Sequence, residues 1–266
     1  MSEASTSSAK GAPPSAWKTA IAKATADGVV VRGYDVVNEL TGTIDFGQMI
    51  HLLFKGELCS PATSRMINAL FVCVADHGIS PSSTVTRFVQ ASGVPIQCAV
   101  AAGIMTIGDI HGGAGEAFTR NLQDLVAKST AAGSALADVA REYVLQHKRV
   151  EGFGHPQHPE GDPRTSRLFE LAEEYGLAGS HIAMTRCLEK ALQERVGRAI
   201  PANVDAAIGA IISDMGFDWR FARAFIAIPR SAGLFAHAVE EQVRESGWRQ
   251  IPLDQIHYDG VVRTAS

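Results

Sequence analysis

The segment Cys98-Ala99-Val100-Ala101-Ala102-Gly103-Ile104-Met105 decides how this 266-residue sequence folds. Every side of the helix that it predicts carries apolar or small residues, which favours close packing by neighbouring helices near the centre of the molecule. It leads into Ile110-His111-Gly112-Gly113-Ala114-Gly115-Glu116-Ala117. We therefore expect a central helix that points at His111, on a glycine-rich turn that another molecule can reach.

Apolar residues recur at helical spacing on both sides of this segment. The stripes that predict helices are Phe46/Met49/Ile50/Leu53, Met66/Ile67/Leu70/Phe71/Val74, Phe118/Leu122/Leu125/Val126, Leu136/Val139/Ala140/Tyr143, Leu168/Leu171/Ala172/Tyr175, Leu188/Ala191/Leu192 and Val204/Ile208/Ile211/Ile212/Met215. Gly56 is expected to end the first helix, and Ser60-Pro61 to begin the second. Only residues 28–33, with three consecutive valines, are typical of a strand, and they are too short to build a sheet unaided. The sequence predicts an all-α fold.

The composition indicates a globular chain with a sizeable core. Hydrophobic residues make up 46% of the chain, and 24 Lys+Arg against 28 Asp+Glu give a formal net charge of -4. This balance provides no general attraction for nucleic acid or anionic lipid. The sequence has neither a signal-peptide core nor an apolar run near the roughly 20 residues that span a bilayer. We expect no nucleic-acid partner and no membrane partner.

Cysteine usage predicts a cytoplasmic protein with reduced thiols. The four cysteines show no Cys-x-x-Cys spacing, and three lie in apolar helical runs, which favours buried thiols over disulfides or zinc. They are Cys59, Cys73, Cys98 and Cys187. The beginning of the chain is rich in Ser, Ala, Pro and Lys without apolar periodicity, so residues 1–27 are expected to form a flexible tail.

Three short segments carry the candidate chemistry. His111 and His155 lie on glycine-lined turns, the second in Gly152-Phe153-Gly154-His155, and Asp205 begins an apolar helical pattern in Asn203-Val204-Asp205. Two imidazoles and one carboxylate suffice to move a proton on and off a carbon next to a carbonyl while a second carbonyl is polarised. This set favours acid-base chemistry at carbon.

Each segment also has a simpler interpretation. His111 alone fits a loop histidine with its hydrogen bonds satisfied, and Asp205 alone fits a carboxylate at a helix N-terminus. The Gly-Phe-Gly-His segment follows no predicted strand and lacks the features of a nucleotide-binding loop. His155 and His158 suggest a metal site, but prolines interrupt any helix there and no acidic or Cys partner stands at ligand spacing, so we expect no metal.

The order of these motifs along the chain resembles the citrate synthase family. The motifs are Val74-Ala75-Asp76-His77, the His111 segment, Gly152-Phe153-Gly154-His155 with Asp162-Pro163-Arg164, Asn203-Val204-Asp205, and Ile228-Pro229-Arg230-Ser231-Ala232-Gly233. Arg32-Gly33-Tyr34 and the Leu52-Leu53-Phe54-Lys55-Gly56-Glu57-Leu58 segment also resemble that family. The resemblance covers the chain from about Arg32 to Pro252.

Within the family, the chain resembles the short citryl-CoA lyase branch, which is related to the C-terminal part of ATP-citrate lyase. The resemblance implies a large helical lobe with an inserted smaller helical lobe. We expect the large lobe from residues 28–111 and 217–266, the latter with the C-terminal segment, and the small lobe from residues 112–216. It also implies a homodimer or a higher homo-oligomer.

The resemblance further implies roles for individual residues. His111 would hydrogen-bond the thioester carbonyl, His155 would act on the keto or hydroxyl oxygen, and Asp205 would exchange the methyl proton of acetyl-CoA. His111 lies just before a predicted helix, and this position is expected to lower the pKa of His111 and keep its imidazole neutral. The substrate carboxylates would be held by His77, Arg164, Arg230 and Arg249, and coenzyme A by Gly152, Phe153 and Gly154. Coenzyme A is expected as part of the substrate, with no tightly bound cofactor.

The implied reaction is cleavage of citryl-CoA, or a close hydroxyacyl-CoA, to acetyl-CoA and oxaloacetate or a related keto acid. The alternatives are a citrate or methylcitrate synthase that runs the condensation, another acyl-CoA enzyme such as a thioester hydrolase, and a catalytically silent regulatory subunit. The chain departs from the family pattern at Ile251, where a partner-subunit arginine is expected next to Pro252. Arg249 is the nearby arginine, and Ile226 replaces a frequent phenylalanine.

Overall fold

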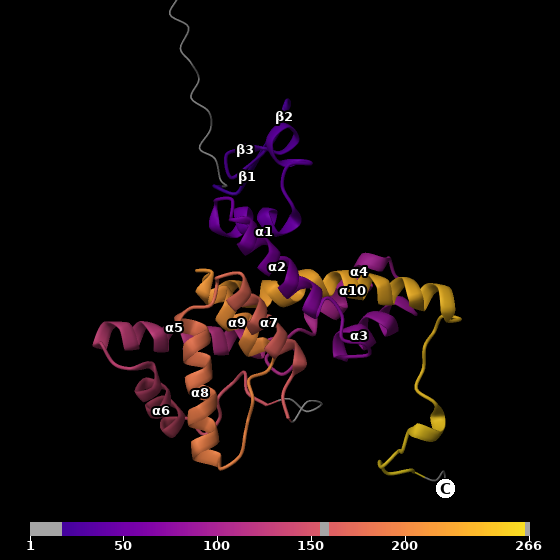
Figure 1. Ribbon diagram of the computed structural model, residues 1–266. Helices are drawn as coiled ribbons and strands as arrows, with labels where there is room; N and C mark the ends of the chain where they lie inside the picture. Colours follow the sequence, from indigo (N-terminus) through magenta and orange to yellow (C-terminus); the bar gives the residue numbers. More distant parts are fainter. Residues whose placement is uncertain (1–17, 155–159, 264–266) are drawn as a thin grey trace, which may run out of the picture. The chain divides into compact units, whose positions relative to one another are not determined.

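The structure is a computed structural model that describes residues 18–154 and 160–263. The chain divides into two compact units, residues 1–60 and 61–266 (Figure 1). This division differs from the expected lobe boundaries at residues 112 and 216, which stay a prediction. His155 and His158 lie outside the described residues.

The first unit holds a small antiparallel sheet of β1 (Ala22–Thr25), β2 (Gly28–Val31) and β3 (Tyr34–Asp35) in that order. The predicted strand is β2, and it pairs on both sides. β1 lies within residues 1–27, so the flexible tail expected there does not extend through residues 22–25. Sequence patterning missed both partner strands. The two-residue turn between β2 and β3 is a tight hairpin, in which Arg32 and Gly33 have positive φ, 50° and 93°.

A short π-helix, η1 (Val36–Leu40), and the helix α1 (Phe46–Lys55) complete this unit. Asp45 caps α1 at its start in a capping box with Gln48, and Gly56 ends it in the left-handed conformation. Val31, Leu40 and Leu52 form the buried cluster between the sheet and the helices. The first predicted helix is confirmed, including its end.

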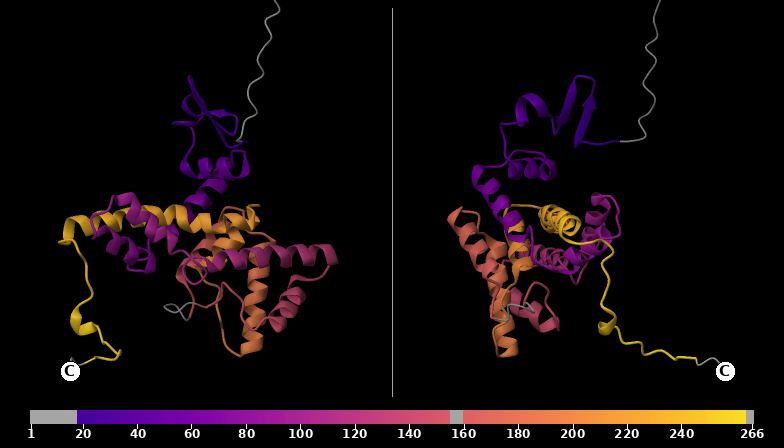
Figure 2. Two further views of the ribbon diagram at one scale, coloured as in Figure 1. Left: turned by 180° about the vertical axis from the view of Figure 1, so that it is seen from behind. Right: turned by 90° about the vertical axis from the view of Figure 1, so that its right-hand side faces the viewer.

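The second unit is a bundle of helices (Figures 1 and 2). Its elements are α2 (Pro61–Val74), α3 (Pro81–Gln90), α4 (Ile96–Met105), α5 (Ala114–Ala132), α6 (Leu136–Gln146), α7 (Pro163–Glu174), α8 (Ser180–Val196), α9 (Val204–Asp214), η2 (Trp219–Phe221), α10 (Ala222–Arg244) and η3 (Leu253–Gln255). Helix α9 packs against α5, α7, α8 and α10, and all of its residues from Ala206 to Ser213 are buried. Helix α10 packs against α2, α3 and α4. Within the described residues the fold is helical, as the sequence predicts, and carries a small sheet that the sequence analysis did not predict.

The helix α4 differs from its expected environment. Ala99, Val100 and Gly103 are buried against α3 and α10. Cys98, Ala101 and Met105 are exposed, Met105 to 84%. Within a single chain, therefore, only one side of α4 is packed against other helices, and the small and apolar residues on its other side are exposed.

Hydrophobic periodicity did not identify α3 and α10. The inward face of α3 is polar, because its buried residues are Ser82, Ser83, Thr86 and Gln90. Helix α10 contains Pro229 in its interior, and proline is normally a sign that a helix ends. No helix within the described residues is both long and apolar enough to cross a bilayer.

Candidate active site

His111 lies in a tight loop between α4 and α5. The loop is closed by backbone hydrogen bonds from Gly108 N to His111 O (3.1 Å) and from His111 N to Gly108 O (2.9 Å). Arg223 of α10 holds the loop from outside by ion pairs with Asp109 and Glu116. The sequence therefore presents His111 on a braced turn at the start of α5, as expected.

The His111 imidazole faces α3. Its Nε2 lies 3.1 Å from the hydroxyl of Ser82, whose side chain is fully buried. Burial lowers the pKa of His111, and the positive charge of Arg230 and the nearby His77 lower it further. The direction agrees with the prediction, but burial is the largest cause, where the helix terminus was expected. A neutral imidazole results, with one nitrogen directed at Ser82.

Asp205 lies in the first turn of α9, next to the start of α5. Asn203 caps α9 by accepting a hydrogen bond from Ala206 N (3.1 Å). A Cβ placed on Gly115 would lie 3.4 Å from the Asp205 Cβ, an ordinary van der Waals contact, so Asp205 is adjacent to the start of α5. Burial raises the pKa of the Asp205 carboxyl, against the positive charge of Arg164. Asp162 adds to the rise in pKa, and Arg230 opposes it.

The turn Gly152-Phe153-Gly154, which is predicted to contact coenzyme A, is hydrogen-bonded to the segment that precedes Asp205. Gly154 N donates to Pro201 O (2.8 Å), and Asn203 N donates to Gly152 O (2.9 Å). The Asn203 side chain also donates to Gly154 O (3.1 Å). The motif that leads to His155 and the motif that carries Asp205 are thus adjacent, although 49 positions separate Gly154 from Asn203 in sequence. His155 itself lies outside the described residues.

Arg164 lies at the start of α7 and is held by its own helix cap. Its Nε and Nη2 donate to the two oxygens of Asp162 at 3.0 and 2.7 Å. This fork leaves the edge formed by Nη1 and Nη2 for another carboxylate. The side chain of Asp162 is fully buried, so the pair is fixed in place.

Arg230 is buried on α10 with an exposed fraction of only 7%. Its Nε donates to Val74 O (3.1 Å). Among the described residues, its two terminal nitrogens have no hydrogen-bond partner. Burial lowers the pKa of Arg230, while the negative charges of Asp76 and Asp205 oppose this and Arg164 adds to it. A buried guanidinium with open donors is a site for an anion.

The second unit thus brings together most of the predicted side chains. Asp205 and the two arginines Arg164 and Arg230 affect one another's pKa values, and Arg230 and His77 lower the pKa of His111. Arg249 is elsewhere: it forms ion pairs with Glu241 (2.8 Å) and Glu245 (3.0 Å) near the end of α10. Its expected role at a partner subunit's substrate stays a prediction.

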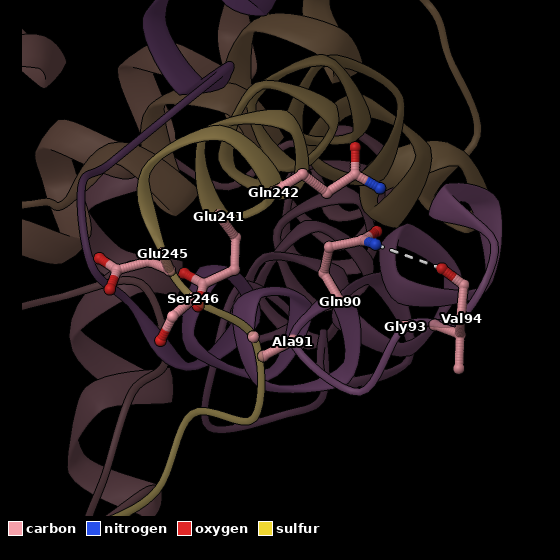
Figure 3. A pocket seen from close by; sticks show the side chains of 9 residues that line it. Gln90, Ala91, Gly93, Val94, Glu241, Gln242, Glu245 and Ser246 are labelled. Atoms are coloured by element: carbon pink, nitrogen blue, oxygen red, sulfur yellow. Dashed lines mark hydrogen bonds between the residues drawn. The ribbon is translucent and has the colours of Figure 1, made fainter.

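A separate pocket of about 320 Å³ lies between the end of α3 and the end of α10 (Figure 3). Gln90 and Glu241 line it from opposite sides, and Gln90 donates to Val94 O (3.2 Å). None of the predicted site residues lines this pocket. It is distinct from the cluster around Asp205.

Sequence reasoning missed three polar side chains that support the cluster. Ser82 contacts His111, Asp162 fixes Arg164, and Asp76 lies close enough to Arg230 to affect its pKa. Asp162 and Asp76 stand within quoted motifs, next to residues with assigned roles. Ser82 had no signal in the sequence, because it contacts His111 across 29 positions.

Comparisons with known proteins identify the family of the chain. The sequence profile of the family described as "Citrate synthase, C-terminal domain" matches residues 47–251. The glyoxysomal citrate synthase of Cucurbita maxima is 30% identical over 185 residues, which cover 67% of this chain and 35% of that protein. The chain spans between 35% and 42% of the length of the first curated relatives that it matches.

Two solved structures are similar over 94% of the chain. The citryl-CoA lyase from Hydrogenobacter thermophilus is 34% identical, with a TM-score of 0.86 and 97% of that chain covered. The ATP citrate lyase from Methanothrix soehngenii, solved with citrate and coenzyme A, is 21% identical, with a TM-score of 0.78 and 43% of that chain covered; this likeness shows the fold. The chain therefore belongs to the citrate synthase family, and within that family it resembles the citryl-CoA lyase branch.

Proposed function

We propose that the chain is a citryl-CoA lyase, which cleaves citryl-CoA or a close hydroxyacyl-CoA to acetyl-CoA and oxaloacetate or a related keto acid. The observation that carries this proposal is the buried Arg230 with open terminal nitrogens, in one cluster with Arg164, Asp205 and His111. Two guanidinium edges fit the carboxylates of a tricarboxylic acyl group. The 34% identity with the citryl-CoA lyase from Hydrogenobacter thermophilus supports the reaction class.

The reaction needs one proton removed and one added. His155 would take the proton of the tertiary hydroxyl, so that the oxygen becomes the ketone of oxaloacetate as the carbon–carbon bond breaks. The electron pair of that bond moves to the methylene carbon and forms the enolate of acetyl-CoA. Asp205 would then deliver a proton to that carbon, and both groups would be reset by exchange with solvent.

The electrostatics of the described residues support these roles. A raised pKa favours the protonated carboxyl of Asp205, which is the form that donates a proton to carbon. A neutral His111 whose Nε2 accepts a hydrogen bond from the Ser82 hydroxyl would carry its proton on Nδ1. The Nδ1–H group would then donate a hydrogen bond to the thioester oxygen. Such a donor stabilises the negative charge that develops on this oxygen.

We further propose how coenzyme A binds, how the chain assembles and where the protein is located. Coenzyme A would enter as part of the substrate and contact the Gly152-Phe153-Gly154 turn, with no tightly bound cofactor. A second copy would cover the exposed apolar face of α4 in a homodimer or larger homo-oligomer. The four cysteines are free thiols, which suits a cytoplasmic location.

A citrate or methylcitrate synthase is the second candidate, favoured by the names of the curated relatives. Ile251 argues against the synthase, because it stands where the family's partner-subunit arginine is expected. Loss of one charge-assisted pair would weaken binding of free oxaloacetate by about 1.5–3 kcal/mol, roughly 10- to 150-fold. A substrate joined to coenzyme A would lose less, since the coenzyme contributes its own binding.

The test is to supply citryl-CoA to the purified protein, follow oxaloacetate and acetyl-CoA, and then assay synthesis from those two products. We expect ready cleavage and feeble net synthesis of citrate. Brisk citrate release at micromolar oxaloacetate, with no cleavage of citryl-CoA, would contradict the lyase proposal and favour the synthase.

A further inference from the structure

One face of α10 carries polar contacts for which the proposed chemistry does not account. Arg230, Gly233 and His237 stand at positions i, i+3 and i+7 of this helix and so share a face. Against them lies the connection between α2 and α3, which carries Asp76 and His77. This face of α10 therefore connects Arg230 to the segment that carries His77. Both residues are predicted to hold substrate carboxylates.

The connection is held to α10 at successive points. Arg230 Nε donates to Val74 O, and a Cβ on Gly233 would lie 2.3 Å from Ala75 O, so only glycine permits this approach. His237 Nε2 lies 3.0 Å from the Asp76 carboxylate. The other oxygen of Asp76 accepts from Gly78 N (2.7 Å) and shapes the turn that follows His77.

The contacts of His237 fix the orientation of its ring. Arg87 Nη1 lies 3.3 Å from His237 Nδ1, and a guanidinium donates but cannot accept. Nδ1 must then hold its lone pair, and Nε2 carries the proton that is donated to Asp76. The side chain is largely buried, with 13% exposed.

We propose that His237 is a positioning residue, whose imidazole bridges Arg87 and Asp76 and holds the His77 connection beside Arg230 for binding of a substrate carboxylate. This inference rests on the proposed function, because it assigns the His77 and Arg230 region to substrate. His237 acts through Asp76 and is not itself placed against the reacting atoms.

The charged groups that face His237 come from two other elements. Asp76 faces it from the α2–α3 connection and Arg87 faces it from α3. Arg87 in turn lies 3.8 Å from Glu240 and 2.8 Å from Glu241 of α10, and 4.0 Å from Glu245, which follows this helix. These carboxylates hold the Arg87 guanidinium in place against His237.

The experiment compares four variants with the wild type in citryl-CoA cleavage. His237→Ala should raise KM about tenfold while kcat stays within about threefold, the scale of one lost hydrogen bond to a charged group. Asp76→Asn should do the same, and the double variant should be no worse than either by more than about threefold. His237→Gln keeps a donor toward Asp76 and an acceptor toward Arg87, so it should restore KM.

The control is Arg244→Ala, which breaks an exposed ion pair on the same helix. The inference is overturned if His237→Ala leaves KM unchanged, if kcat falls instead, or if the effects of His237→Ala and Asp76→Asn multiply in the double variant. A wild-type protein that cleaves no citryl-CoA would refute the proposed function. In that case calorimetric binding of citrate decides the inference: weaker binding in His237→Ala and Arg230→Ala supports it, and wild-type-like binding by His237→Ala, or no citrate binding by the wild type, overturns it.

Discussion

At the scale of single residues, Asp205 is the side chain on which the proposed chemistry most depends. Asp205→Asn keeps the shape but removes the titratable group. We expect cleavage and the exchange of acetyl-CoA methyl protons to fall by at least about 10²-fold, the scale of a lost general acid or base. Binding of the acyl-CoA should persist. Proton NMR of acetyl-CoA in deuterated water measures the exchange, with the exposed Asp138→Asn as control.

The protonation state of Asp205 gives a sign to the pH dependence. Its pKa is raised by burial, and cleavage needs the protonated form. The cleavage rate should therefore decline as pH rises through this pKa, whereas exchange of methyl protons, which needs the carboxylate, should increase. Both profiles can be recorded on one preparation. A cleavage rate that climbs steadily with pH would show that Asp205 is not the acid.

Ser82 is a second residue whose effect can be measured. Ser82→Ala removes the hydroxyl that lies 3.1 Å from His111 Nε2 and leaves the rest of α3 intact. A net hydrogen bond is worth about 0.5–1.5 kcal/mol, so we expect kcat to fall by about 2- to 10-fold. Ser92→Ala, an exposed serine just beyond α3, is the matched control. An unchanged kcat would mean that the Ser82 hydroxyl does not orient His111.

At the scale of elements, Asp214 joins two helices. Its carboxylate, at the end of α9, accepts from the backbone of Gly179 (2.8 Å), His181 (2.9 Å) and Ile182 (3.1 Å) at the start of α8. The His181 ring lies 2.8 Å away as well. Burial would raise the pKa of Asp214, but the His181 ring and these backbone groups together hold it below its ordinary value. The stabilisation is therefore present above the ordinary value of 3.8 and is lost as pH falls through the depressed value.

Asp214→Ala should lower the free energy of unfolding by about 1.5–3 kcal/mol at neutral pH, since it removes hydrogen bonds to a charged acceptor. The difference from wild type should shrink in strong acid. Urea unfolding followed by circular dichroism at two pH values measures both effects, with Glu170→Ala on the surface of α7 as control. Equal stability of variant and wild type at neutral pH would contradict the assignment.

At the scale of the whole molecule, the exposed face of α4 points to assembly. Ala101 and Met105 lie on this face, and obligate interfaces resemble a core cut in half. We expect wild type to be dimeric or larger, and Ala101→Glu to shift it toward monomer and reduce cleavage. Light scattering at assay concentration measures this, with Leu145→Glu on an exposed part of α6 as control. A fully active wild-type monomer would contradict the expectation.

The sequence by itself determined the helical class, the family and the order of the motifs. Helices such as α1, α2 and α9 were predictable because their buried faces are apolar at a regular spacing, and because Asp45, Gly56 and Asn203 mark their ends. The same reasoning failed for α3, whose inward face is polar, and for α10, which continues through Pro229. A local sequence pattern predicts a helix only where the buried residues are apolar and recur at helical spacing.

Only the tertiary structure decided what surrounds each candidate side chain. The contacts of Ser82 with His111, Gly115 with Asp205, and His237 with Asp76 join residues far apart in the chain, so no local pattern encodes them. The same holds for the pKa of Asp205, which burial raises because α5 and α7 pack around the start of α9. Spacing along the chain names the residues that carry chemistry, whereas the low-dielectric packing of distant elements sets their charge, because electrostatic energy depends on distance and solvent access.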